Sequence, residues 1–192
     1  MKQLKLITVV VLFLTTMTGF AQQTWKNDPM HSRLGFTTTH MLISDINGIF
    51  KTFELNMVAT KEDFSDAKVE LKADISSIDT EVEPRDNHLR SPDFFDAAQY
   101  TTLNFKSTSI QKISKDKYKL KGNLTIHNIT KPVEVEMVYR GTIVNPNSNK
   151  KTAGFQFKGL LKRLDFNVGT TMPETLISND VKIAADAELI LQ

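Results

Sequence analysis

Residues 84–95, PRDNHLRSPDFF, form the one compact segment with helical signals in a chain that otherwise carries the pattern of β-strands. Pro84 can occupy the first turn of a helix, where its missing N–H is not needed, and Ser91 begins a second start signal. We therefore predict two short helical turns that end in the adjacent Phe94 and Phe95. A helix that carries two phenylalanines into an all-β protein must bury them, and the open end of a barrel or sandwich offers the space. The segment is predicted to form a lid over a β scaffold.

The sequence on both sides of this segment alternates apolar and polar residues with the two-residue period of half-buried strands. In residues 66–74, for example, four apolar side chains alternate with Lys68, Glu70, Lys72 and Asp74. Such alternation predicts eight strands, at residues 32–40, 51–59, 66–74, 103–105, 117–126, 133–139, 153–157 and 181–191, with a turn at 128–132 and a polar loop at 145–151. Eight strands suit a closed antiparallel barrel, which leaves no exposed sheet edge. We predict an all-β, eight-stranded antiparallel barrel with a short helical insertion.

The polar faces of these strands are dense in lysine and glutamate, which cannot face the hydrocarbon of a membrane. The apolar faces must therefore point inward, and a barrel of this size either fills itself with side chains or encloses a small apolar ligand. The predicted ligand-binding set is larger than a self-filled barrel requires. It consists of Phe36, Phe53, Leu55, Val69, Leu71, Phe94, Phe95, Phe105, Leu124, Val135, Met137, Phe155 and Phe157.

The amino-terminal residues 1–21 have the pattern of a secretory signal peptide, with Lys2 and Lys5, an apolar run, and Gly19 and Ala21 before the predicted cleavage site. The remaining residues 22–192 are predicted to form a single domain, periplasmic or secreted. The chain has 24 basic and 22 acidic side chains, so removal of the two lysines balances the charges. This balance excludes the basic footprint of a nucleic-acid-binding protein. Because there is no cysteine, neither disulfides nor a lipoprotein anchor is expected.

The predicted lid also carries a cluster of polar side chains, Arg85, Asp86, His88 and Arg90. These residues could supply an acid, a base and an anion-binding group, with Arg85 and His88 as possible contacts to a ligand head group. The alternative is that they cap the helix and tie it to strand ends, which we favour because no nucleophile or second base is readable nearby. The four histidines are dispersed along the chain, so no metal site is predicted. No catalytic residue and no cofactor is expected either.

Many short motifs are spread over residues 25–166, and their order and spacing together are specific. They are Trp25, Asp28, residues 31–32 (HS), Phe36, His40, Gly48, Phe50, residues 75–80 (ISSIDT), 85–89 (RDNHL), 94–96 (FFD), 104–108 (NFKST), 122–126 (GNLTI) and 130–133 (TKPV), Arg163 and residues 165–166 (DF). In these motifs the sequence resembles the YceI-like family of secreted lipid- and polyisoprenoid-binding proteins of bacteria. Asn128, Asn167 and Asn179 stand where the family often has glycine; asparagine is the side chain that best tolerates a left-handed backbone.

The resemblance implies a lipocalin-like barrel that holds a long isoprenoid chain, whereas the residues alone imply an apolar interior in an exported protein. Our leading hypothesis is a non-catalytic protein, monomer or homodimer, that sequesters or carries a polyisoprenoid, an isoprenoid quinone or a similar lipid. The first alternative is an enzyme acting on a small lipid or isoprenoid substrate through Arg85, Asp86 and His88. The second is a self-filled barrel that serves only as an interaction scaffold. The orientation of the His88 ring and the presence of an internal void distinguish these hypotheses.

Overall fold

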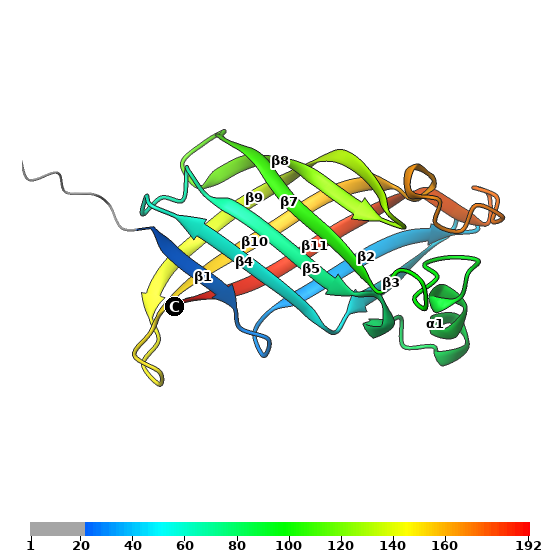
Figure 1. The fold of residues 1–192 in the computed structure, drawn as a ribbon, viewed down its shortest axis with the longest axis horizontal. Helices are drawn as coiled ribbons and strands as arrows, with labels where there is room; N and C mark the ends of the chain where they lie inside the picture. The colour runs from blue at the N-terminus through cyan, green and yellow to red at the C-terminus, as the bar shows by residue number, and fades with distance from the viewer. Residues whose placement is uncertain (1–21) are drawn as a thin grey trace, which may run out of the picture.

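The computed structural model describes residues 22–192, so the predicted signal peptide lies outside the described residues. The described chain forms one antiparallel sheet with one short α-helix and two short 3-10 helices (Figure 1). The elements are β1 (Gln23–Asn27), β2 (Arg33–His40), β3 (Ser44–Phe50), β4 (Phe53–Ala59), β5 (Lys68–Asp74), η1 (Ile75–Ser77), β6 (Ile78–Asp79), α1 (Glu83–Arg90), β7 (Thr102–Lys112), β8 (Lys117–Ile126), β9 (Ile129–Val144), β10 (Lys151–Lys162), η2 (Arg163–Phe166) and β11 (Ile177–Leu191). No helix in this part of the chain is both long and apolar enough to cross a membrane.

The sheet closes because β1 pairs on one side with β4 and on the other with β11. Trp25 lies opposite Met57 in β4 and opposite Leu191 in β11. The closed ring therefore runs β1-β4-β5-β7-β8-β9-β10-β11, which is eight strands. Beyond this ring, β2 pairs with β11, β3 pairs with β2, and β6 pairs with β3, so these three segments extend the same sheet. The structure confirms the predicted eight-stranded antiparallel barrel with a short helical insertion.

All eight predicted strands are present, as β2, β4, β5 and β7 to β11, but β1, β3 and β6 were not predicted. These three segments are short or interrupted by polar residues, so their alternation is weak. The predicted turn at 128–132 was wrong, because β9 already begins at Ile129. His127 and Asn128 alone make the turn, with φ of 51° and 56°. A two-residue hairpin turn with positive φ at both positions matches the twist of the flanking strands.

The predicted lid begins as a helix and continues as turns. Helix α1 starts after Val82, with Pro84 in its first turn, and ends at Arg90. Beyond it, the predicted second helical turn is instead a series of hydrogen-bonded turns, in which the N–H of Phe94 donates to the carbonyl of Ser91 at 3.1 Å. A chain that turns here delivers the two phenylalanines sideways toward the barrel, which a continued helix would not do.

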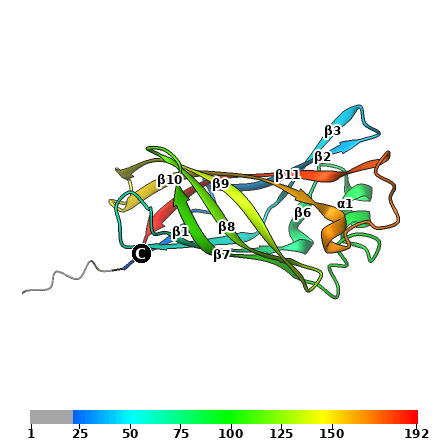
Figure 2. The same cartoon turned by 90° about the horizontal axis from the view of Figure 1, so that it is seen from above.

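One end of the barrel is filled by an aromatic cluster centred on Phe64, in the loop between β4 and β5. The Phe64 ring lies 5.4 Å from that of Trp25, 5.0 Å from Tyr139 and 4.9 Å from Phe155. The same loop is held by the Tyr118 hydroxyl, which donates to the carbonyl of Asp63. At the other end, α1, η2 and the β2–β3 hairpin gather around the barrel rim (Figure 2). The barrel is thus closed by side chains at one end and covered by inserted segments at the other.

Candidate binding cavity

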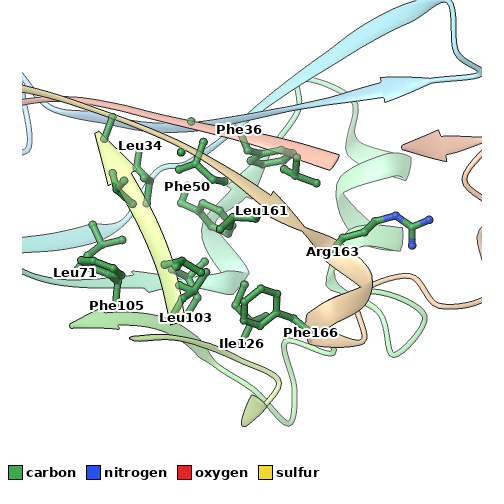
Figure 3. A pocket seen from close by; sticks show the side chains of 18 of the residues that line it. Leu34, Phe36, Phe50, Leu71, Leu103, Phe105, Ile126, Leu161, Arg163 and Phe166 are labelled. Carbon is green, nitrogen blue, oxygen red and sulfur yellow. The ribbon is translucent and has the colours of Figure 1, made fainter. Parts of the chain in front are cut away.

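Between the aromatic cluster and the covered end, the barrel holds a cavity of about 180 Å³. By comparison, one water molecule in the liquid occupies about 30 Å³, so the void has the volume of about six. Its walls are almost entirely apolar, and they come from every strand of the closed ring except β1 and from β2, β3 and the lid. The lining side chains include Leu55, Val69, Leu124, Val135, Phe157 and Val181. Figure 3 labels others of the wall, Leu34, Phe36, Phe50, Leu71, Leu103, Phe105, Ile126, Leu161 and Phe166. A barrel filled by its own side chains would have no such void, so the cavity argues against the scaffold hypothesis.

The predicted ligand-binding residues line this cavity with three exceptions. Phe36, Leu55, Val69, Leu71, Phe94, Phe95, Phe105, Leu124, Val135 and Phe157 form part of its wall. Phe53, Met137 and Phe155 do not. Phe155 packs edge-on against Phe64, and Met137 is fully buried, so both belong to the packed core instead. Strand alternation shows which side chains point into the barrel. Whether an inward side chain lines the cavity or packs in the core depends on its position along the barrel axis, which alternation does not give.

The two lid phenylalanines reach the interior from outside the sheet. Phe94 is 4% exposed, and its ring lies 4.9 Å from the ring of His88. Phe95 packs edge-on against Phe50 of the barrel wall at 6.1 Å. A β-carbon built on Gly169, whose φ is +63°, would lie 2.7 Å from the Phe94 ring. Glycine is therefore needed there twice, for its backbone conformation and for the close approach of the lid.

Arg163 is the charged side chain of the cavity wall, and sequence reasoning did not assign it a site role. Only 5% of the residue is exposed. Figure 3 shows its guanidinium turned away from Leu71 and Phe105, at the covered end of the barrel. All five of its N–H groups donate to backbone carbonyls, those of Val168, Gly169, Met172, Ile177 and Ser178, at 2.5 to 3.1 Å. Burial lowers the pKa of this guanidinium.

These bonds make Arg163 the anchor of the segment between η2 and β11. Because a guanidinium has five N–H donors and all are used, none is left for a ligand head group. The positive charge has no carboxylate in hydrogen-bond contact among the described residues. The cavity therefore offers an apolar wall with a charged but fully hydrogen-bonded end.

The polar cluster of the lid faces away from the cavity. Asp86 is buried and accepts hydrogen bonds from the backbone N–H and the hydroxyl of Thr80, at 2.8 and 2.5 Å. Arg85 donates to the hydroxyl and carbonyl oxygens of the same threonine, and Arg90 donates to the carbonyl of Ile78. These contacts tie α1 to β6.

His88 lies on the exposed side of the helix, where its Nε2 is 3.2 Å from a carboxylate oxygen of Asp93 and its side chain is 47% exposed. Neither Arg85 nor His88 is part of the cavity wall. Two N–H groups of Arg85 donate to Thr80 and the His88 ring lies on the exposed side of the helix, so neither predicted head-group contact faces the cavity. The acid–base hypothesis loses its motivation for the same reason, since the cluster does not open toward an enclosed substrate.

A second polar group, Asp28, His31 and Glu188, brings three potential ligand atoms within 4.8 Å of one another at the β1–β2 turn. Asp28 accepts a hydrogen bond from the backbone N–H of Met30, and its other oxygen lies 2.8 Å from Nδ1 of His31. This hydrogen bond raises the pKa of His31 and lowers that of Asp28. These hydrogen bonds stabilise the turn that joins β1 to β2 next to Glu188 of β11. They explain why the three side chains lie together, so no bound ion is needed.

A YceI-like domain model matches residues 25–189, which is nearly the whole described chain. This chain belongs to the YceI-like family. A curated relative, protein YceI of Salmonella newport, is 32% identical over 182 residues and covers 95% of this chain and 93% of its own.

Two solved structures share the fold of this YceI-like barrel. BcnA of Burkholderia cenocepacia superposes with a TM-score of 0.77 at 22% identity, over 84% of this chain and 98% of its own. A polyisoprenoid binding domain from Saccharophagus degradans, implicated in plant cell wall breakdown, gives a TM-score of 0.66 at 15% identity, over 91% of this chain and all of its own. At these identities the two likenesses concern the fold alone.

Proposed function

We propose that this protein binds one long apolar chain, of the polyisoprenoid or isoprenoid-quinone class, inside its barrel and sequesters or carries it. The observation that carries the proposal is the cavity inside the barrel, which is lined by aliphatic and aromatic side chains, with Phe94 and Phe95 of the lid in its wall. The related fold of a polyisoprenoid binding domain supports the same ligand class. Burial of a hydrocarbon chain contributes about 0.8 kcal/mol per methylene, so chain length would dominate affinity.

The polar end of such a ligand is not gripped by hydrogen bonds in this proposal. Arg163 is the charged group at the wall, and its N–H groups are all engaged with backbone carbonyls. Its charge would still favour an electron-rich end, such as a quinone or hydroxyl oxygen, over a cationic one. Ligands that share the chain but differ in their uncharged head groups should therefore bind with similar affinity.

We further propose that the protein acts outside the cytoplasm, in the periplasm or as a secreted protein, without a catalytic step. The basic and apolar pattern of residues 1–21 supports export. Long isoprenoids have negligible solubility in water, so an exported barrel would provide the aqueous route that they lack. Sequestration and carriage both follow from the same cavity.

The direct test is to purify the protein from its native host and to extract it with organic solvent. The extract should contain a long-chain lipid detectable by mass spectrometry, and added isoprenoid should raise the melting temperature of the emptied protein. An extract without lipid, together with an unchanged melting temperature, would contradict the proposal.

A further inference from the structure

The β2–β3 hairpin ends in three consecutive exposed aliphatic side chains, Met41, Leu42 and Ile43, which we name the hairpin tip. They are 53%, 67% and 83% exposed. Figure 2 shows this hairpin projecting beyond the barrel at the end where α1 lies. Contiguous exposed apolar residues on a water-soluble surface mark interaction sites more often than chance. None of the three residues lines the cavity, so ligand binding there does not explain their exposure. The tip is therefore a candidate contact surface.

The backbone of the tip also argues that folding does not account for these residues. Met41 and Leu42 both have left-handed backbone conformations, with φ of 51° and 64°. Large side chains are disfavoured there, whereas asparagine and glycine are tolerated. Elsewhere in the chain, Asn128 and Asn167 occupy such positions. Phe64 is another large apolar residue with positive φ, but its ring is buried in the aromatic cluster. At the tip, Met41 and Leu42 combine a left-handed backbone with exposed apolar side chains, and such exceptions cluster at functional sites.

The tip is physically continuous with the covered end of the cavity. The N–H of Met41 donates to the carbonyl of Leu176 at 2.9 Å, and the next residue, Ile177, lies in the cavity wall. Thr38, near the end of β2, lies in the same wall. A surface that binds the tip would therefore face the segments through which a ligand would enter or leave.

We propose that the hairpin tip inserts into the surface of a lipid bilayer and so brings the covered end of the barrel to the membrane. Three aliphatic side chains at a turn can be buried about 5–10 Å deep, at the boundary between head groups and acyl chains. A stable protein interface instead needs about 800 Å² from each partner, and three side chains supply well under that area. The inference rests on the proposed function, because the membrane is then the source or destination of the bound chain.

The tip itself carries no charge, and its charged neighbours Asp45 and Lys182 lie 3.6 Å apart and offset each other. Attachment should therefore depend on apolar insertion rather than on anionic lipid. Binding to vesicles of pure phosphatidylcholine should change little when sodium chloride is raised to about 0.5 M, since salt screens only charge interactions.

The test measures co-sedimentation of residues 22–192 with phosphatidylcholine vesicles, with no other ligand present. These residues contain the whole closed barrel and omit the apolar run of residues 1–21, which would itself bind lipid. The tip variant is Met41→Asn/Leu42→Asn/Ile43→Asn, which suits the left-handed backbone and should fold at least as stably as the unmodified chain. The matched control, Ile113→Asn/Ile143→Asn/Val144→Asn, removes three aliphatic side chains, 56%, 64% and 55% exposed, from the β7–β8 turn and the last two residues of β9, at the opposite end.

We expect the unmodified chain and the control to bind vesicles, and the tip variant to partition at least tenfold less while it still binds an isoprenoid in vesicle-free solution. An unmodified chain that ignores vesicles, or a control that loses binding equally, would overturn the inference. Tip-dependent dimerisation without vesicle binding would also overturn it, in favour of a second copy as the partner. Isoprenoid binding in vesicle-free solution is scored separately, so failure of the tip is distinguishable from failure of the cavity.

Discussion

Arg163 is a single side chain that organises the covered end of the barrel. Its five hydrogen bonds to backbone carbonyls fix the segment that joins η2 to β11, including Gly169, against which Phe94 packs. From the sequence, an isolated arginine after a strand gives no sign of this role, because its partners are carbonyl groups that every residue has. Only the family motif that contains Arg163 indicated that the position is special.

We predict that Arg163→Lys destabilises the protein even though the charge is kept. An ammonium has three donors, so at least two of the five carbonyls lose theirs, at a cost of about 1–3 kcal/mol for each buried group left unpaired. Chemical denaturation of both proteins would measure the loss. An unchanged midpoint would show that the carbonyls find other donors and that Arg163 is not the anchor.

Asp63 provides a test of the opposite, closed end. Its hydrogen bonds with Lys112 and Ser65 lower the pKa of its carboxyl from the ordinary 3.8 to about 2. A carboxyl whose pKa is lowered on folding stabilises the native state above its unfolded pKa, and this contribution is lost as pH falls through the folded value. We predict that Asp63→Asn lowers stability at pH 7, modestly because both side chains of the ion pair are over 40% exposed. The difference from wild type should shrink between pH 4 and pH 2; a constant difference would contradict this assignment.

At the scale of elements, the lid combines α1 with the turns that follow it. Polar contacts tie α1 to β6, and Phe94 and Phe95 reach the cavity beyond the helix. The sequence predicted the lid because proline, serine and paired phenylalanines are local signals. It did not predict where the charged side chains of the helix would point, because the partners of Arg85 and Asp86 are set by how α1 docks on β6.

Replacement of both phenylalanines by alanine should open this lid. The fold should lose less than about 3–5 kcal/mol per ring, the cost for a fully buried phenylalanine, while a bound fluorescent polyene should dissociate faster. Leu189→Ala is the control, because Leu189 is fully buried away from the cavity and should destabilise the barrel without opening it. An unchanged dissociation rate in a folded Phe94→Ala/Phe95→Ala protein would leave the segment as packing alone.

At the scale of the whole molecule, alternation along eight strands was sufficient to predict the closed barrel and the inward direction of its apolar faces. Weakly patterned pieces such as β1 and β3 were missed, although the ring closes through β1. Asn128 and Asn167 adopt the left-handed backbone expected of glycine replacements, while Asn179 instead accepts a hydrogen bond from the N–H of Leu164. The cavity itself could not be predicted, because a void depends on how side chains from distant strands fit together.

The central claim is that this void is the binding site, and Gly159 allows a direct test. It lies in the cavity wall in β10, and a β-carbon there would make ordinary contacts of 3.5 Å. Gly159→Phe should therefore place a ring in the void without breaking a hydrogen bond. Gly154, an odd number of residues away in the same strand, faces Arg140 on the outer surface, so Gly154→Phe is the matched control.

The decisive measurement is a fluorescence titration of the unmodified protein and these two variants with a polyene chain, after circular dichroism has shown that all three are folded. The account predicts saturable binding by the unmodified protein and by Gly154→Phe, and at least tenfold weaker binding by Gly159→Phe. Equal binding by all three folded proteins would contradict it, because the chain would then lie outside the barrel.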